Sequence, residues 1–280
     1  MEIFYRIAEL DDFISEAKKK NKTIGFVPTM GALHKGHLSL VHQSNIECDV
    51  TIASIFVNPI QFNDKKDFEK YPRTNDSDIF LLRDAKCDAV FIPSVSEMYP
   101  EDINTNYDFG TIDKVLEGEF RPGHFNGVAI VVRRLFELVS ADKAFFGEKD
   151  FQQLLIIKEL VKKLNIKIEI VGCPIVRESD GLAMSSRNMR LTPDERIEAS
   201  NINKILLDAK NKFPIMDINE IKLEVKNKIN SFSKMKLDYF EIVDKKSLAV
   251  VSNWDDAEEL IECIAVFVGE VRLIDNMFIK

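Results

Sequence analysis

The sequence predicts an α/β protein, with a doubly wound parallel sheet in a larger domain and a smaller α+β domain after it. Up to Val176, short apolar runs alternate with segments of helical spacing, as in a sheet whose parallel strands are joined by helices. Beyond Val176 the pattern changes to helices followed by a few strands, which is typical of a small domain with an antiparallel sheet. The length of 280 residues is sufficient for both. We therefore expect domains at residues 1–176 and 177–280.

About five parallel strands are expected in the larger domain. The segment 50–57 is almost continuously apolar, as in a strand that is buried on both faces of a parallel sheet. Pro28 and Pro93 cannot donate to a sheet ladder, so each ends a strand. The expected strands are 23–27, 50–57, 89–92, 143–146 and 167–171, and the expected helices are 10–17, one from 36, 76–85, 127–139 and 150–164. Connections of this kind are right-handed in about 98% of cases, which favours a doubly wound sheet.

Residues 94–123 lose this alternation, because Gly and Pro recur there among polar residues. A connection of this length is usually functional or mobile. For this loop both alternatives stay open.

The smaller domain is expected to begin with helices. Thr192, Pro193 and Glu195 stand as an N-cap, a first-turn proline and a capping-box glutamate, which predicts the start of a helix. A lysine-rich helical stretch continues to about Ser231, and apolar runs that predict strands follow at 237–243, 261–268 and 271–274.

Composition argues against several classes of partner. The net charge of −8 and the pI of about 5.2 disfavour a surface built to bind nucleic acid or an anionic membrane. The four cysteines are scattered, without the spacing of a zinc site, a redox dithiol or a disulfide framework. No signal peptide is evident, and no apolar run approaches the roughly 20 residues of a membrane span. We expect a soluble, cytoplasmic protein with small-molecule partners, no nucleic acid and no membrane.

Residues 23–39 join an apolar strand, a glycine-containing turn and the start of a helix. A helix that starts just past the carboxyl end of a strand points backbone N–H groups and a positive dipole into the crevice where open α/β folds bind ligands, which favours an anion such as phosphate. Gly31 and Gly36 have the spacing of a P-loop, but His37 and Leu38 stand where that motif requires Lys and then Ser or Thr. No G-x-G-x-x-G is present either.

The two histidines of this junction, His34 and His37, are candidates for chemistry. Imidazoles at such a turn can donate hydrogen bonds to phosphate oxygens and stabilise the charge that develops when the bond between the α- and β-phosphates breaks. The pair also has the spacing of half a metal site, or of two ordinary residues on a helix surface, and these alternatives stay open.

Two further segments carry phosphate-binding side chains. In Gly147-Glu148-Lys149-Asp150, directly after an expected strand, Lys149 can meet a phosphate and Asp150 can cap the next helix or hold a ribose hydroxyl. The loop 179–188 offers Ser185, Ser186 and Arg187, which are two hydroxyls and a bidentate cation. Each segment alone is often polar surface structure, which is the more common case for 147–150, but three such segments together favour a phosphate site.

A second substrate could be held by amides at the same sheet edge. Gln61 and Gln153 offer donors and acceptors that suit a small polar hydroxy acid, although glutamine is most often a surface residue. Asp78, in an acidic stretch, is a candidate for contact with Mg²⁺ through water; the more common alternative is a solvated helix start.

With these segments identified, the sequence resembles the pantothenate synthetase family, also called pantoate–β-alanine ligases. The matching segments are long and follow one another in the family's order. They are PTMGALHKGH at 28–37, FVNPIQF at 56–62, YPRT at 71–74, RPGHFNGV at 121–128, FFGEKDFQQL at 145–154 and SDGLAMSSRN at 179–188. The smaller domain carries no matching motif beyond its opening loop.

The resemblance implies a nucleotidyltransferase whose HIGH-type signature is His34-Lys35-Gly36-His37 and whose KMSKS-type signature is Met184-Ser185-Ser186-Arg187. It implies catalytic roles for His34, His37, Lys149 and Arg187, with His37 as proton donor. The residues that it assigns to ATP are Met30, Gly31, Ala32, Leu33, His34, Lys35, Gly36, His37, Gly147, Glu148, Lys149, Asp150, Val176, Met184, Ser185, Ser186 and Arg187.

The resemblance also implies the organic substrates. Gln61 and Gln153 would hold pantoate, Gln61 would also hold β-alanine, and Asn58 and Arg121 would complete the site. Contact of Mg²⁺ with Asp78 is not implied by the resemblance, because family members vary in this stretch. The implied reaction joins pantoate to β-alanine through a pantoyl adenylate with release of AMP and diphosphate, in a protein that is usually a homodimer. Two alternatives are another nucleotidyltransferase of the same superfamily and a nucleotide-binding regulator that performs no chemistry.

Overall fold

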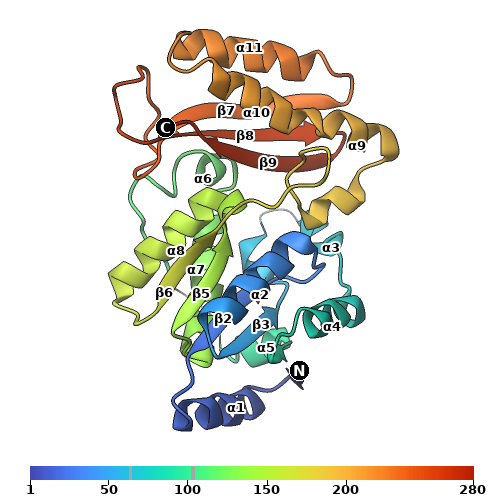
Figure 1. Cartoon of the computed structure of the whole chain (residues 1–280), viewed down its shortest axis with the longest axis vertical. Helices are drawn as coiled ribbons and strands as arrows, with labels where there is room; N and C mark the ends of the chain where they lie inside the picture. The colour runs from blue at the N-terminus through green and yellow to red at the C-terminus, as the bar shows by residue number, and fades with distance from the viewer. Residues whose placement is uncertain (63–64, 102–104) are drawn as a thin grey trace. The chain divides into compact units, whose positions relative to one another are not determined.

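The computed structural model describes residues 1–62, 65–101 and 105–280, which Figure 1 shows coloured along the chain. The chain divides into two compact units. Unit 1 consists of Met1–Phe109, Arg121–Glu148 and Gln153–Pro174, and unit 2 of Gly110–Phe120, Lys149–Gln152 and Ile175–Lys280. The domain division at residues 1–176 and 177–280 stays a prediction. Within the loop expected at 94–123, residues 102–104 lie outside the described residues.

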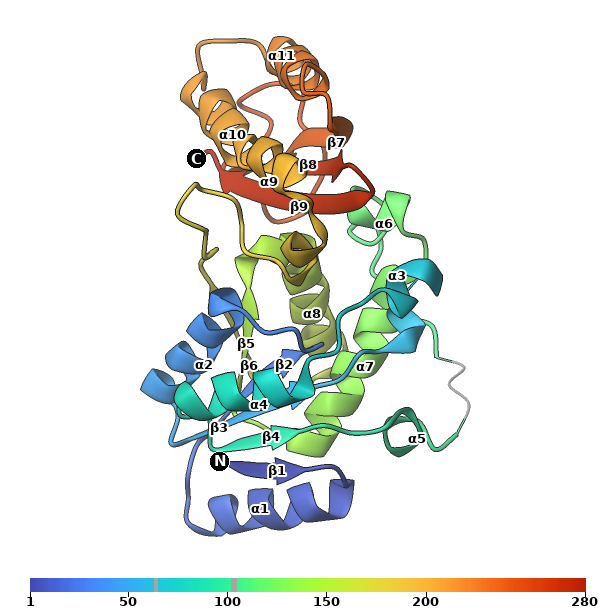
Figure 2. The ribbon, with the colours of Figure 1, turned by 90° about the vertical axis from the view of Figure 1, so that its right-hand side faces the viewer.

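Unit 1 contains a six-stranded parallel sheet in the order β1-β4-β3-β2-β5-β6 (Figure 2). The strands are β1 (Glu2–Phe4), β2 (Ile24–Thr29), β3 (Val50–Ile55), β4 (Ala89–Phe91), β5 (Lys143–Gly147) and β6 (Glu169–Cys173). The predicted α/β fold class is confirmed. The edge strand β1 is a sixth strand that the sequence did not predict. Its three residues are too few to show a period.

Helices cover both faces of this sheet. Phe26 in β2 contacts Phe136 in α7, whereas its neighbour Val27 belongs to a core cluster with Leu40 and Val41 of α2. Successive residues of a strand point to opposite faces, so α7 and α2 lie on opposite sides. The helical segments of this part of the chain are α1 (Ile7–Lys19), α2 (Lys35–Glu47), η1 (Pro59–Gln61), α3 (Lys65–Glu69), α4 (Asn75–Asp84), α5 (Val95–Met98), α6 (Glu117–Phe120), α7 (His124–Val139), η2 (Glu148–Asp150) and α8 (Phe151–Leu164).

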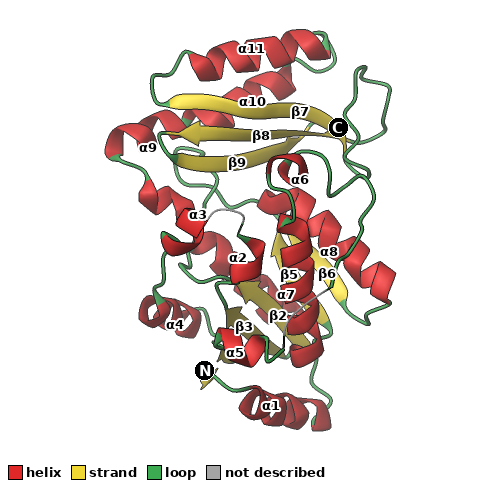
Figure 3. Cartoon of the chain, turned by 180° about the vertical axis from the view of Figure 1, so that it is seen from behind, coloured by secondary structure: helices red, strands yellow, loops and turns green. Residues whose placement is uncertain are grey.

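Unit 2 is built on a three-stranded antiparallel sheet in the order β7-β8-β9 (Figure 3). The strands are β7 (Met235–Asp244), β8 (Leu260–Val268) and β9 (Val271–Phe278), and the helical segments are η3 (Ser186–Arg190), α9 (Pro193–Ala199), α10 (Asn201–Asn211) and α11 (Ile218–Asn230). Apolar residues of α10 and α11, such as Ile205 and Ile221, form one core cluster with Ile264 and Val266 of β8. The expected α+β arrangement, helices followed by an antiparallel sheet, is therefore present.

The register of unit 1 positions its loops. Thr29 at the end of β2 is paired with Ile55 at the end of β3, and β5 lies beside β2 in the same direction. The carboxyl ends of parallel strands meet at one edge of a sheet. The segments that follow β2, β3 and β5 therefore leave the sheet at the same edge.

Candidate active site

The turn after β2 brings the two predicted histidines together. Gly31 and Ala32 have positive φ angles of 81° and 49°, which turn the chain sharply before α2. His34 is the N-cap of α2, and its Nδ1 accepts a hydrogen bond from the Gly36 N–H at 3.2 Å. The Nδ1 of His37 accepts one from the His34 N–H at 3.3 Å, which completes a capping box made of two imidazoles.

These contacts determine the tautomers of both histidines. A neutral imidazole that accepts through Nδ1 carries its proton on Nε2. Both Nε2–H groups, on the nitrogen farther from the backbone, are thereby donors, and the ring centroids are 4.1 Å apart. The structure thus places two donors side by side at the carboxyl end of β2.

Asp78 fixes the same turn from α4. Its carboxylate accepts hydrogen bonds from the Ala32 N–H at 2.9 Å and the Leu33 N–H at 2.8 Å, and the Thr74 hydroxyl donates to it at 3.2 Å. Asp78 is buried, with only 1% of the residue exposed. Two backbone N–H groups of the predicted anion site are therefore occupied by a carboxylate of the protein itself. The predicted contact between Asp78 and Mg²⁺ stays a prediction.

Gln61 is held in a network at the end of β3. The residue is 7% exposed, and its amide Nε2 donates to the Met30 sulfur at 2.9 Å. Its Oε1 accepts from the amide of Asn58 at 3.2 Å, and Tyr99 donates to Asn58 Oδ1 at 2.9 Å. Burial raises the pKa of Tyr99, so the phenol keeps the proton that it donates. The structure thus joins Met30 and Asn58 to Gln61 by hydrogen bonds.

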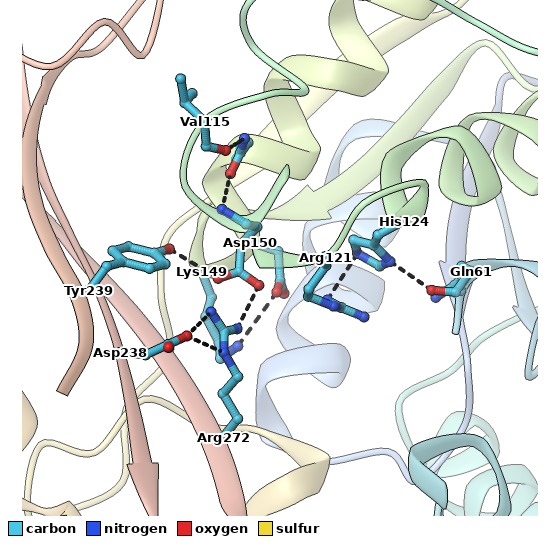
Figure 4. Close-up of polar contacts among 11 residues, drawn as sticks. Gln61, Val115, Arg121, His124, Lys149, Asp150, Asp238, Tyr239 and Arg272 are labelled. Atoms are coloured by element: carbon cyan, nitrogen blue, oxygen red, sulfur yellow. Dashed lines mark hydrogen bonds and ion pairs between the residues drawn. The ribbon is translucent and has the colours of Figure 1, made fainter. Parts of the chain in front are cut away.

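His124, which the sequence patterns do not single out, joins two of the predicted residues. Its Nδ1 lies 2.8 Å from the Gln61 carbonyl oxygen, and its Nε2 lies 3.1 Å from Arg121 NH1 (Figure 4). The residue is 6% exposed and starts α7. The signal that points to it is its place in the quoted segment RPGHFNGV, three residues after Arg121.

The connection from β5 to α8 carries three further predicted residues. Gly147 ends β5, Glu148 follows it, and Gln153 lies in the first turn of α8. A Cβ added to Gly147 would meet no atom within 4 Å, so this backbone is open to a ligand. Gln153 is half-buried, and its amide has no hydrogen-bond partner among the described residues. The neighbouring Gln152 has a structural role, because it is buried and bonded to the backbone of Ile112, Val115 and Glu117.

Unit 2 brings Lys149 together with the loop that carries Arg187. The Asn276 amide of β9 donates to the Lys149 carbonyl at 2.9 Å, and the adjacent Asp275 accepts two hydrogen bonds from Arg177, at 2.6 and 3.0 Å. Lys149 Nζ lies 3.6 Å from Asp150, and 17% of the lysine side chain is exposed. One end of β9 therefore anchors both segments.

The loop after Arg177 is a short antiparallel turn. Met184 N–H donates to the Val176 carbonyl at 3.0 Å, and Arg177 forms a β-bridge with Ala183. Ser185 is the N-cap of η3, and its Oγ accepts from the Arg187 N–H at 3.3 Å. The predicted nucleotide residues 176 and 184–187 are therefore neighbours in space.

Comparison with known proteins identifies the family. The sequence model of a family described as pantoate-beta-alanine ligase matches residues 2–278. The chain belongs to this family. The predicted resemblance is thereby confirmed, and the protein is an enzyme of the ligase class, which leaves the non-catalytic regulator without support.

Relatives agree over the full length. The chain is 50% identical over 277 residues to the pantothenate synthetase of Porphyromonas gingivalis, covering 99% of both chains, and 49% identical over 280 residues to that of Bacteroides thetaiotaomicron, covering 100% of this chain and 99% of the relative. The crystal structure of pantothenate synthetase from Thermus thermophilus superposes with a TM-score of 0.93, at 39% identity and 100% coverage of both chains. A pantoate-beta-alanine ligase from Francisella tularensis, complexed with beta-gamma ATP and beta-alanine, gives a TM-score of 0.83 at 36% identity, with 99% and 97% coverage.

Among the described residues, no group of three or more His, Cys, Asp or Glu side chains is arranged to hold a metal ion. In the same part of the chain, no helix is both long enough and apolar enough to span a membrane.

Proposed function

We propose that the protein condenses pantoate with β-alanine to pantothenate, with ATP as co-substrate and a pantoyl adenylate as intermediate. The observation that carries this proposal is the pair His34 and His37 at the carboxyl end of β2, each with an Nε2–H donor. Family membership supports the condensation, and the related Francisella protein was crystallised with an ATP ligand and β-alanine.

In the first step, a carboxylate oxygen of pantoate attacks the α-phosphorus of ATP, and the bond from this phosphorus to the bridging oxygen of diphosphate breaks. Negative charge increases on that bridging oxygen as diphosphate leaves. His34 and His37 donate hydrogen bonds to the phosphates, with His37 as the proton donor, and Lys149 and Arg187 offset the charge. Orientation and electrostatic stabilisation of this kind dominate such reactions, so no covalent protein nucleophile is required.

In the second step, the amine of β-alanine attacks the carbonyl carbon of the adenylate. The carbon–oxygen bond to AMP breaks, and the amine loses a proton as the amide forms. The adenylate is labile in water, so a covered site protects it. Gln61 and Gln153 hold pantoate, Gln61 also contacts β-alanine, and Asn58 and Arg121 complete the pocket.

ATP is proposed to contact two groups of residues. These groups are the turn 30–37 with the glycine backbone at 147–148, and residues 149–150, 176 and 184–187. Mg²⁺ would neutralise phosphate charge when it enters with ATP. A metal ligand role for Asp78 has no support in its contacts, because both oxygens already accept hydrogen bonds from the turn and from Thr74.

The reaction is tested by following AMP. We expect AMP to form only when ATP, pantoate and β-alanine are all present. With pantoate labelled by ¹⁸O in its carboxylate, AMP should acquire one labelled oxygen, because the attacking oxygen stays on phosphorus when the amine displaces AMP. Formation of ADP, or AMP without label, would contradict the adenylate.

We also propose that the protein acts as a homodimer in the cytoplasm, as the family resemblance implies. Sedimentation equilibrium tests the assembly, since one chain has a mass of 32.1 kDa. A single species of that mass at assay concentration would refute the dimer.

A further inference from the structure

His124 lies between two residues of the proposed substrate site, both in unit 1. Its Nδ1 is 2.8 Å from the Gln61 carbonyl oxygen, and its Nε2 is 3.1 Å from Arg121 NH1. A carbonyl oxygen only accepts, and a guanidinium only donates. Nδ1 must therefore carry the proton, and Nε2 must present its lone pair to Arg121. Only the neutral Nδ1–H tautomer satisfies both partners, which is the opposite of the tautomer found for His34 and His37.

The first turn of α7, which carries His124, packs closely against η1. A Cβ on Gly127, one turn along α7, would come within 2.7 Å of the Gln61 Cα, so the first turn of α7 packs directly on the backbone of η1. The Asn58 amide donates both to the Gly127 carbonyl at 3.1 Å and to Gln61 Oε1 at 3.2 Å. Gln61 is thus joined to α7 twice, by its carbonyl oxygen to His124 and by its side chain through Asn58 to Gly127. Arg121 is joined to α7 through His124.

We propose that His124 is a positioning residue that fixes the Arg121 guanidinium beside Gln61 to bind a substrate carboxylate. The proposal rests on the function proposed above. A guanidinium matches a carboxylate through two parallel hydrogen bonds, but a flexible arginine loses side-chain entropy when it binds. A hydrogen bond from Arg121 to His124 restricts that side chain before substrate arrives. Pantoate and β-alanine both carry a carboxylate, so the experiment measures both.

Two substitutions separate the two hydrogen bonds. In His124→Asn the amide nitrogen takes the place of Nδ1, so it can still donate to the Gln61 carbonyl, but the acceptor that Nε2 offers to Arg121 NH1 is removed. In His124→Gln the amide oxygen reaches the place of Nε2 and can accept from Arg121. His42, an exposed histidine of α2 in the same unit, provides the matched control as His42→Asn.

Steady-state kinetics test the link to Arg121. We expect His124→Asn to raise the KM for pantoate or for β-alanine about tenfold, the effect of losing one hydrogen bond to a charged group, with kcat within about twofold. The substrate whose KM rises is the one that Arg121 binds. Arg121→Ala should raise the same KM, the double variant should raise it no further than Arg121→Ala alone, and His124→Gln should restore much of it. The proposal would be overturned if the effects of His124→Asn and Arg121→Ala on KM were additive in the double variant. It would also be overturned if KM stayed unchanged for both substrates.

A second measurement does not depend on activity. The ¹⁵N chemical shifts of the His124 ring, assigned by comparison with the His124→Asn protein, should be those of the Nδ1–H tautomer. An Nε2–H tautomer would overturn the inference even if the enzyme is active. If no AMP forms from the three substrates, the proposed function fails while the tautomer result still stands, so the two failures are distinguishable.

Discussion

At the scale of single residues, the two ring nitrogens of His37 have different roles, one in the turn and one toward the substrate. Nδ1 accepts from the His34 N–H, and Nε2–H is the donor proposed for the phosphates. We expect His37→Ala to lower the rate of adenylation by about two orders of magnitude or more, the scale of losing one oriented charge stabiliser. Single-turnover release of diphosphate measures this rate.

His37→Asn keeps an acceptor close to the backbone but removes the distant donor, so it should be nearly as slow as His37→Ala. His42→Ala, on the exposed side of the same helix, is the control and should react normally. A near-normal adenylation rate in either His37 variant would remove this histidine from the mechanism.

Asp78 offers a second test at this scale. Asp78→Ala would remove the buried carboxylate that accepts hydrogen bonds from the N–H groups of Ala32 and Leu33. Because each unsatisfied buried donor costs about 1–3 kcal/mol, we expect the free energy of unfolding in urea to fall by about 2–4 kcal/mol. Asp76→Ala, at an exposed position in the same first turn of α4, should change it by less than about 0.5 kcal/mol. A stable Asp78→Ala enzyme that needs far more Mg²⁺ would instead show that Asp78 holds the metal.

Residue contacts of this kind also show what a sequence can and cannot predict. The histidine pair is predictable because capping box, turn and helix start all lie within a few consecutive residues. The contact from Asp78 to Ala32 spans 46 residues and that from His124 to Gln61 spans 63. No local pattern encodes such pairs, so the sequence alone suggests a metal contact for Asp78 and gives no role to His124.

At the scale of elements, the segment 110–120 is joined to the small sheet of unit 2 by a partly buried charge cluster. Arg272 NH1 donates to Glu117 Oε2 at 2.8 Å and its Nε to Asp238 at 2.9 Å, while the Tyr239 hydroxyl donates to Glu117 Oε1 at 3.0 Å (Figure 4). Burial raises the pKa of Tyr239, so it stays a donor. The sequence predicts only an irregular loop here, because Glu117 and Arg272 are 155 residues apart.

This cluster makes the segment sensitive to one substitution. Glu117→Ala would leave the half-buried Arg272 guanidinium with one of its two carboxylate partners missing, at a cost below the roughly 3–5 kcal/mol of a fully buried pair. We expect much faster amide hydrogen exchange across 110–120, measured by mass spectrometry, than in the parent protein. Glu119→Ala, which alters an exposed side chain two residues away, is the control. Equal exchange in the two variants would show that the cluster does not hold the segment.

The elements themselves are predictable to the extent that they follow a period. The apolar run at 50–57 and the capping box at Thr192 correspond to β3 and to the start of α9, which has Pro193 at its first turn. The edge strand β1 escapes prediction, because its three residues become a strand only by pairing with β4. Tertiary pairing, not local propensity, decides such short elements.

At the scale of the whole molecule, the small sheet contains a carboxyl group that opposes folding at neutral pH. Glu262 in the central strand β8 is 0% exposed, and neither of its oxygens has a hydrogen-bond partner among the described residues. Burial raises its pKa from 4.5 to about 9, the carboxylate of Asp275 acts in the same direction, and Lys210 lowers it. The folded protein therefore holds this proton more tightly than the unfolded chain does.

The sign of the pH dependence follows from this difference. An acid whose pKa is higher in the folded state contributes its full stability below the unfolded pKa of 4.5, and that contribution is lost as the pH rises toward 9. The loss approaches about 1.4 kcal/mol per pH unit between these values. We expect Glu262→Leu, which fills the site with an apolar side chain, to raise the melting temperature, and to raise it more at pH 8 than at pH 5.5. Glu258→Leu, at an exposed position before β8, should shift it equally at both pH values. Other groups titrate in both proteins, so the quantity to compare is the difference in melting temperature between Glu262→Leu and the parent protein at each pH. If that difference is the same at both pH values, Glu262 carries no buried proton.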